Sequence, residues 1–178
     1  FVNIVKEMKV GHPADPTSKQ GAIVSKVHYE KILSYIKLAK EEGGTILTGG
    51  HAVFPKGYEK GWYIAPTIIE GLSPNCRTNQ EEIFGPVVTI MPFETEAEVL
   101  QYANGTHYGL SCTIWTENIS RANRLAKNIQ AGIVWINTWL HRDLRTPFGG
   151  VKNSGVGREG GWEALRFFTE AKNVCIAF

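Results

Sequence analysis

Glu81-Glu82-Ile83-Phe84-Gly85-Pro86-Val87 is the segment that decides how the chain is read, since two carboxylates and an aromatic ring precede a Gly-Pro pair and an apolar run. Proline fixes its own backbone and disfavours helix in the residue before it, which here is glycine, the most permissive type. The pattern predicts a sharp turn into a buried strand at residues 87–91, with Glu82 and Phe84 held at its mouth. A solvated helix end followed by a core-capping turn explains the same residues, so local chemistry alone leaves both interpretations open.

The composition is that of an ordinary globular chain, either one domain or a large part of one. Of its 178 residues, 43% are hydrophobic and 20% are charged, and a formal charge of +2 favours neither nucleic acid nor a membrane as a partner. We find no Lys/Arg run, no metal-ligand spacing and no apolar run near the roughly 18–20 residues of a membrane helix, and we expect no signal peptide. Three widely spaced cysteines form no disulfide framework, which predicts a reducing, cytoplasmic setting.

The chain opens on Phe1 with apolar residues already at helical spacing, but without an initiator Met or a helix cap. We therefore expect it to be a piece of a longer protein.

Alternating helix and strand signals follow. Three helices are marked by a cap residue at their start, namely Ser25, Thr95 (with Glu98 completing a capping box) and Asn118. Short apolar or alternating runs predict strands at residues 45–48, 62–65, 67–69, 109–115 and 133–136. Strands and helices alternating at these lengths imply right-handed crossovers, so the sequence predicts an α/β fold with a mainly parallel sheet and flanking helices.

The last third of the chain is less regular. Residues 137–158 are rich in Gly, Arg and aromatic side chains and lack periodicity, which predicts a long functional loop. A helix at residues 159–168 and a strand at residues 169–176 are expected to follow. The alternation in this last strand is imperfect, and a terminal strand of this kind often pairs with another chain.

Residues 155–160 match GxGxxG, the phosphate-binding fingerprint of dinucleotide folds. That fingerprint requires an apolar strand before it and an acidic residue about 20 positions later. Residues 151–154 are not such a strand and the chain ends at Phe178, so we interpret these glycines as helix-entry residues.

A nucleophilic cysteine needs exposure and a nearby positive group or helix N-terminus, and the three cysteines differ in this respect. Cys112 and Cys175 lie in predicted strands and are expected to be small buried hydrophobes. Cys76, in a loop beside Arg77, is the one cysteine to test, and a structural role is favoured for it as well.

Arg142 and Arg145 lie among Trp, Leu, Pro and Phe in the segment 139–150. A partly desolvated guanidinium there would bind a carboxylate strongly through two hydrogen bonds. The alternative, which the residues alone slightly favour, is a surface salt bridge from Arg142 to Asp143 or from Arg145 to a glutamate, which contributes little.

Four segments occur together in the order and spacing of one known family: EEIFGPV at 81–87, YGL at 108–110, AGIVWIN at 131–137 and PFGGVKNSGVGRE at 147–159. Over essentially its whole length the chain resembles the C-terminal part of an NAD(P)-dependent aldehyde dehydrogenase. The resemblance implies that residues 1–160 are the C-terminal part of the catalytic domain. Residues 161–178 would be a C-terminal helix and an oligomerisation strand, and the N-terminal cofactor-binding half is absent.

The resemblance also implies binding roles for particular residues. Glu82 would bind the ribose hydroxyls next to the nicotinamide of NAD, with NADP not excluded, and Phe84 would pack against the nicotinamide end. His28 and Lys31 would contact the adenosine side of the cofactor, and Phe148 would line the substrate pocket. The final strand would join a neighbouring subunit's sheet in a homodimer or homotetramer.

The family mechanism needs groups that are not in this sequence. Its nucleophilic cysteine, general-base glutamate and oxyanion asparagine lie upstream, and they carry out thiolate attack, support hydride transfer to NAD and hydrolyse the thioester. No catalytic residue is assigned here, and the chain alone is expected to be inactive. An alternative interpretation is a non-enzymatic structural or interaction module that keeps the fold.

Arg142-Asp143-Leu144, shortly before PFGG, resembles the branch of the family that acts on 2-aminomuconic or 2-hydroxymuconic semialdehyde. These substrates carry a carboxylate at the end away from the aldehyde. The resemblance implies that Arg142 clamps this carboxylate, with Arg145 as second choice.

Overall fold

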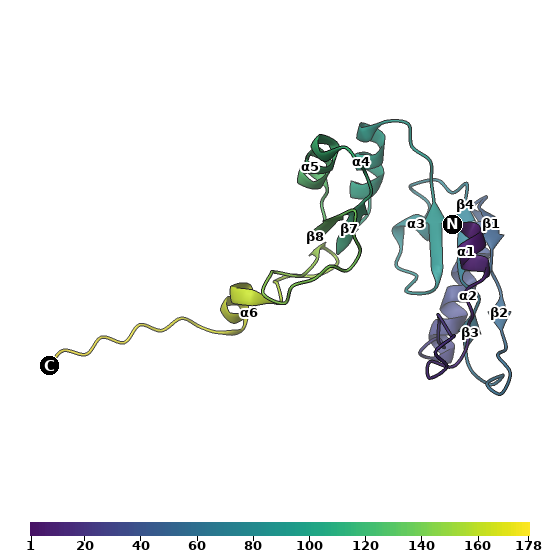
Figure 1. Ribbon diagram of the computed structural model, residues 1–178, viewed down its shortest axis with the longest axis horizontal. Coiled ribbons are helices and arrows are strands. Elements are labelled where there is room, and N and C mark those ends of the chain that lie inside the picture. Colours follow the sequence, from purple (N-terminus) through teal and green to yellow (C-terminus); the bar gives the residue numbers. More distant parts are fainter. The chain divides into compact units, whose positions relative to one another are not determined.

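The computed structural model describes residues 1–178 and divides into two compact units, Phe1–Pro92 and Phe93–Phe178 (Figure 1). Each unit has its own helices and strands. The sequence predicted a different division, between residues 1–160 of a catalytic domain and a C-terminal helix and strand at residues 161–178. That division stays a prediction.

The first unit contains three helices and five strands. The helices are α1 (Val2–Lys6), α2 (Lys26–Glu41) and α3 (Arg77–Gln80). The strands are β1 (Thr45–Thr48), β2 (Ala52–Val53), β3 (Tyr63–Ile64), β4 (Thr67–Glu70) and β5 (Val87–Ile90). A three-stranded sheet has the order β1-β4-β5, in which β1 is antiparallel and β5 parallel to β4, and β2 pairs with β3 in antiparallel fashion.

Helix α2 supplies one side of the core of this unit. Its buried stripe of Ile32, Ile36 and Ala39 packs into clusters that include Ile64 of β3 and Ile69 of β4. Burying an isoleucine side chain fully stabilises the fold by about 1.5–3 kcal/mol. The helix is therefore fixed against the strands by its apolar stripe, and the polar side chains flanking that stripe have fixed directions.

The second unit contains three helices and four short strands. The helices are α4 (Glu96–Asn104), α5 (Ile119–Asn128) and α6 (Gly161–Phe168). The strands are β6 (Tyr108–Gly109), β7 (Ser111–Ile114), β8 (Ile133–Ile136) and β9 (Val151–Lys152). Strands β7 and β8 are parallel, and β6 pairs with β9 in antiparallel fashion.

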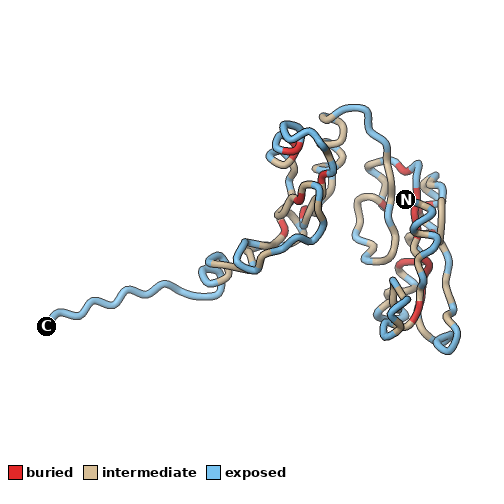
Figure 2. Tube along the Cα trace, in the orientation of Figure 1, coloured by how far each residue is buried: buried red, intermediate tan, exposed pale blue.

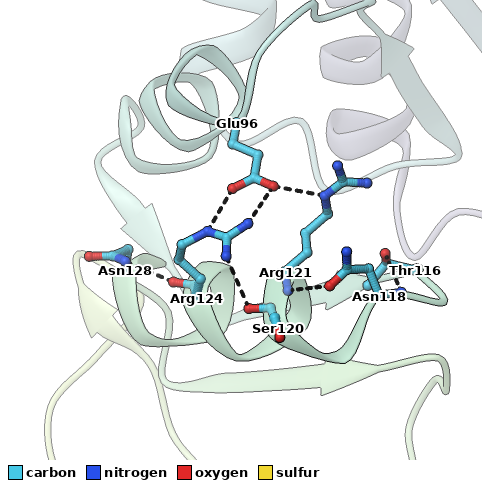
Figure 3. Close-up of polar contacts among 7 residues, drawn as sticks. All are labelled: Glu96, Thr116, Asn118, Ser120, Arg121, Arg124 and Asn128. Atoms are coloured by element: carbon cyan, nitrogen blue, oxygen red, sulfur yellow. Dashed lines mark hydrogen bonds and ion pairs between the residues drawn. The ribbon is translucent and has the colours of Figure 1, made fainter.

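Helices α4 and α5 lie side by side and are joined by one carboxylate (Figures 1 and 3). Glu96 accepts hydrogen bonds from Arg121 Nε at 2.7 Å and from Arg124 Nε and Nη2 at 2.9 and 2.8 Å. The hydrogen bonds from Arg124 and Arg121 lower the pKa of Glu96 to about 2. This partly exposed network links the two helices.

The three predicted helix caps are confirmed. In each case the cap side chain accepts a backbone N–H of the first turn, which would otherwise have no partner. The acceptors are Ser25, Thr95 and Asn118.

The predicted α/β class is confirmed. The two parallel pairs, β4–β5 and β7–β8, are each connected through a helix, α3 and α5 respectively. Three pairs are antiparallel, namely β1–β4, β2–β3 and β6–β9. The last two consist of two-residue strands that the sequence analysis did not predict as such, including β9 within the expected loop at residues 137–158. Two residues are too few for a periodic signal.

No strand forms at residues 169–176, so the predicted final strand is absent from this chain. The tail beyond α6 is exposed (Figure 2), and Cys175, predicted to be buried, is exposed with it. A strand needs a neighbour for its backbone N–H and C=O groups, and none is available within the chain. Pairing of this tail with another subunit stays a prediction.

The chain contains no helix with both the length and the apolar character required to cross a membrane.

A substitution at Gly132 would test the packing of the second unit. A Cβ added at this position would lie 1.6 Å from the carbonyl oxygen of Gly149, so the backbone between α5 and β8 approaches the loop before β9 too closely for any side chain. We predict that Gly132→Ala lowers the free energy of unfolding by about 3 kcal/mol or more, because two backbone segments must move apart. Urea unfolding followed by circular dichroism measures this loss.

Gly21→Ala is the matched control, since a Cβ at Gly21 meets nothing within 4 Å. Equal unfolding midpoints for the two variants would contradict the close approach at Gly132.

Candidate cofactor and substrate site

The polar side of α2 holds the segment 81–87 by its backbone. His28 Nε2 lies 2.7 Å from the carbonyl oxygen of Phe84, and because a carbonyl only accepts, this ring nitrogen carries the hydrogen. Lys31 Nζ donates to the carbonyl oxygen of Glu82 at 2.8 Å. Residues three apart share a helix face, so one side of α2 contacts two carbonyl groups of the loop.

Glu81 is fixed by its side chain. Arg77, one turn earlier in the chain, donates to its carboxylate from Nε at 2.6 Å and from Nη2 at 3.0 Å, and the Tyr35 hydroxyl of α2 donates to the same group. The hydrogen bond from Arg77, and after it that from Tyr35, lowers the pKa of Glu81 to about 2. Of the two adjacent glutamates, Glu81 is therefore engaged within the protein, while the exposed Glu82 carboxylate accepts no hydrogen bond.

Phe84 presents its ring to solvent from a backbone conformation that is uncommon for a residue with a side chain. Its φ is 56°, and the residue is 75% exposed. Such a conformation persists where its surroundings determine it. Here His28 contacts the Phe84 carbonyl oxygen and meets the ring edge to face with 6.0 Å between centroids, and Gly85 packs so closely on Ile32 that a Cβ would lie 2.7 Å from it.

The arrangement fits the cofactor role expected from the sequence. A carboxylate without internal partners accepts hydrogen bonds from sugar hydroxyls, and an exposed ring offers a flat apolar surface. All four residues predicted to bind the cofactor, His28, Lys31, Glu82 and Phe84, are brought together. His28 and Lys31 bind the loop backbone, and their contact with the adenosine side stays a prediction.

A second set of predicted residues comes together in the other unit. The Cζ atom of Arg142 lies 3.9 Å from the centroid of the Phe148 ring, and its Nη2 atom is bonded to the carboxylate of Glu159. Phe148 and Glu159 face each other across an antiparallel bridge and exchange two backbone hydrogen bonds of 2.8 Å. The Arg142 side chain is 35% exposed, so it is partly desolvated, as predicted.

Arg145 is placed differently. Its side chain is 88% exposed and is bound to Asp143, with Nε 2.9 and 3.1 Å from the two carboxylate oxygens. The hydrogen bond from Arg145 keeps the pKa of Asp143 below its usual value. Salt bridges do form in this loop, but the partners differ from those expected, because Arg145 pairs with Asp143 and Arg142 with Glu159. Arg145 is therefore a solvated, neutralised charge.

Backbone carbonyls and glycines shape the loop that carries Phe148. Arg158 Nη1 donates to the carbonyl oxygens of Gly150 and Gly157 at 2.9 and 2.6 Å. Gly160 is the N-cap of α6 with φ of 86°, and its Cβ would lie 2.4 Å from the Thr146 carbonyl oxygen. The helix-entry interpretation is confirmed for this glycine.

Two of the three cysteines lie in surroundings that disfavour a nucleophile. Cys76 is the N-cap residue of α3 and Cys112 lines an apolar cavity of about 480 Å³ between α4, β7 and α5. Burial raises the pKa of both thiols, which disfavours the reactive thiolate. The structural role favoured for Cys76 agrees with this setting.

Three residues that matter to these sites were missed in the sequence. Tyr35 and Arg77 could have been found from spacing, since Tyr35 is four residues after Lys31 on α2 and Arg77 is four residues before Glu81. Glu159 lies 17 residues from Arg142, and no local pattern joins them.

Comparison with known proteins gives one consistent answer. The pattern of the aldehyde dehydrogenase family matches residues 1–174. The 2-aminomuconic 6-semialdehyde dehydrogenase of a Pseudomonas species is 47% identical over 97% of this chain and 35% of its own length. The 2-hydroxymuconic semialdehyde dehydrogenase of Pseudomonas sp. strain CF600 is 48% identical over 96% of this chain and 35% of its own length.

Solved structures agree. Betaine aldehyde dehydrogenase from Staphylococcus aureus, in complex with NAD+, superimposes with a TM-score of 0.90 and 40% identity over 94% of this chain and 33% of that protein. An aldehyde dehydrogenase from Bacillus cereus, also in complex with NAD+, superimposes with a TM-score of 0.89 and 38% identity over 95% of this chain and 34% of that protein. The chain belongs to the aldehyde dehydrogenase family. The chain spans about a third of the length of the curated relatives it matches. Two of these relatives, at 47% and 48% identity, are semialdehyde dehydrogenases.

The pH dependence of stability tests the Glu81 network. A carboxylate whose folded pKa is near 2, below the ordinary 4.5, stabilises the fold above about pH 4.5, and this contribution is lost as the pH falls towards 2. We predict that Glu81→Gln is less stable than wild type at neutral pH and that the difference narrows as the pH falls through this window. Urea midpoints measured from pH 7 to pH 3 follow the change.

Glu82→Gln is the control, because it removes the neighbouring carboxylate, which accepts no hydrogen bond. A difference between Glu81→Gln and wild type that is the same at pH 7 and pH 3 would contradict the network.

Proposed function

We propose that this chain is part of an NAD-dependent aldehyde dehydrogenase that oxidises a carboxylated semialdehyde of the 2-aminomuconic or 2-hydroxymuconic type. The observation that carries the proposal is the guanidinium of Arg142, held on the face of Phe148 with hydrogen-bond donors to spare. The names of the related semialdehyde dehydrogenases support the same substrate class.

Arg142 suits a substrate carboxylate by geometry and charge. One of its nitrogens, Nη2, is bonded to Glu159, and Nε and Nη1 make no hydrogen bond within the protein. A planar guanidinium can offer two parallel donors to a carboxylate, and a hydrogen bond to a charged group contributes about 1.5–3 kcal/mol. The Phe148 ring beneath it removes water from one face, which strengthens the attraction.

Glu82 and Phe84 form the cofactor side of the proposal. The Glu82 carboxylate would accept hydrogen bonds from the ribose hydroxyls, and the Phe84 ring would pack on the nicotinamide end. NAD supplies the hydride acceptor for aldehyde oxidation. This chain would position the cofactor, because the loop that carries Glu82 and Phe84 is bonded to α2 through His28 and Lys31.

The reactive groups are proposed to come from the rest of a longer protein. A thiolate nucleophile and a general base are needed for the thioester chemistry of this family, and we assign neither to this chain. The purified chain alone should therefore show no aldehyde-dependent NAD reduction. Association into a homodimer or homotetramer through the tail at residues 169–176, and a cytoplasmic location, belong to the same proposal.

The test uses a composite enzyme in which this chain replaces the matching segment of the 2-aminomuconic 6-semialdehyde dehydrogenase from Pseudomonas. We predict that Arg142→Ala lowers the ratio of kcat/KM for a carboxylated semialdehyde to that for an uncharged aldehyde by about tenfold or more, because one charge-assisted interaction is lost. NADH formation at 340 nm measures both rates.

Arg145→Ala is the matched control, since this arginine is solvated and neutralised by Asp143. Its ratio should stay within about threefold of the parent's. Equal effects of Arg142→Ala on both substrates would refute the carboxylate site. A well-folded composite that binds NAD but oxidises neither aldehyde would favour a non-enzymatic module.

A further inference from the structure

One face of α2 contacts the loop at residues 81–87 in three places. The helix residues involved are three and four positions apart, which places them on one side of the helix, and they meet the loop in reverse order along the chain. Seven residues of helix rise about 10 Å, the length that three residues of nearly extended chain cover. The two segments therefore run side by side over matching lengths. The three contacts join His28 to Phe84, Lys31 to Glu82 and Tyr35 to Glu81.

Tyr35 makes the third contact, which differs in kind from the other two. Its hydroxyl donates to Oε2 of Glu81, so it holds a side chain and not a backbone carbonyl. The ammonium group of Lys31 lies over its ring, with Nζ 5.7 Å from the centroid. The hydrogen bond to Glu81 raises the pKa of the hydroxyl, which therefore keeps its proton at neutral pH. Tyr35 thus contacts both Glu81 and the lysine that holds the backbone of Glu82.

The surroundings of Tyr35 make it a fixed point. The residue is partly buried and precedes Ile36, which is 3% exposed in the core of the first unit. A tyrosine hydroxyl is placed by only two side-chain torsions, so little conformational freedom is lost when it is held. The other partner of Glu81 is Arg77, whose side chain is 64% exposed and belongs to α3, the helix that has Glu81 as its C-cap. The Arg77 contact therefore lies within α3, whereas the Tyr35 contact joins the end of α3 to α2.

The beginning of α3 has its own attachment to α2. Glu42, the C-cap of α2, accepts the backbone N–H of Arg77 at 2.9 Å. Helix α3 is thus held at its start by Glu42 and at its end by Tyr35. Beyond Glu81 the chain continues directly to Glu82, whose side chain is exposed. The direction in which Glu82 leaves α3 therefore depends on how Glu81 is held.

We propose that Tyr35 is a positioning residue for cofactor binding, whose hydroxyl holds Glu81 so that the neighbouring Glu82 carboxylate points towards the ribose next to the nicotinamide. The inference rests on the proposed function of Glu82 and adds the side chain that sets its direction. Tyr35 does not touch the cofactor. It reduces the number of orientations that Glu82 would otherwise give up when NAD binds, and such preorganisation increases affinity.

The experiment measures the dissociation constants of NAD+ and of ADP for the composite enzyme by titration calorimetry. ADP has the adenosine diphosphate half of NAD+ but not the ribose next to the nicotinamide, so it reports on the rest of the cofactor site. Tyr35→Phe removes the hydroxyl and keeps the ring over which Lys31 lies. It should raise the constant for NAD+ about fivefold, because Glu82 is less well directed, and leave that for ADP within about twofold of the parent.

Tyr102→Phe is the matched control. The Tyr102 hydroxyl also donates to a glutamate, Glu98, at 2.6 Å, but both residues belong to the second unit. Loss of this hydroxyl should change neither constant.

A double-mutant cycle adds a second readout. If Tyr35 acts through Glu82, Tyr35→Phe has no further effect on the NAD+ constant when Glu82→Ala is already present. A residue that affects the site independently of Glu82 raises the constant equally in both backgrounds.

Each other outcome counts against the inference. A constant for NAD+ that Tyr35→Phe leaves unchanged, an equal rise for ADP, or an equal rise with and without Glu82 would overturn it. A variant that unfolds loses ADP and NAD+ alike and is counted among these outcomes. If Glu82→Ala raises the NAD+ constant and Tyr35→Phe does not, the positioning role fails while the proposed cofactor role of Glu82 stands. If Glu82→Ala leaves the constant unchanged, that proposed role has failed first.

Discussion

Two hydrogen bonds from α2 to backbone carbonyls, from His28 to Phe84 and from Lys31 to Glu82, hold the loop on which the cofactor side of this protein depends. They are possible because the apolar stripe of the same helix is buried against β3 and β4, so the helix cannot rotate to follow the loop. Bonds to carbonyl oxygens leave the side chains of Glu82 and Phe84 free. The loop can thus be rigid while its two functional side chains stay exposed, as a preorganised binding surface requires.

The second unit uses the same principle with a different chemistry. Arg142 is a charged side chain in partly desolvated surroundings, where it needs a partner and a fixed direction. Phe148 supplies the surface and Glu159 the partner, and one backbone bridge joins these two residues. Nearby Arg145 is the same residue type, but its side chain is 88% exposed and is paired with Asp143 in solvent. Selectivity between two arginines in one loop therefore comes from what each of them touches.

Local signals explain what the sequence could predict. The caps at Ser25, Thr95 and Asn118 act within one helical turn, so they are visible in sequence. The short strand β9, the division of roles between Glu81 and Glu82 and the pairing of Arg142 with Glu159 depend on contacts between distant residues, and no periodicity reports those. The prediction of a strand at residues 169–176 was wrong for a related reason. An alternating pattern indicates which face a strand would bury, but the strand forms only if a second strand is present to accept its hydrogen bonds.

The most direct test of this account is the dissociation constant of NAD+ for the composite enzyme and its Glu82→Ala variant, measured by titration calorimetry. If residues 81–87 are a cofactor-binding surface held by α2, Glu82→Ala raises the constant by about tenfold or more, because hydrogen bonds to a charged acceptor are lost. Glu70→Ala, which removes an exposed glutamate at the end of β4, leaves it unchanged. An unchanged constant for Glu82→Ala would contradict the account.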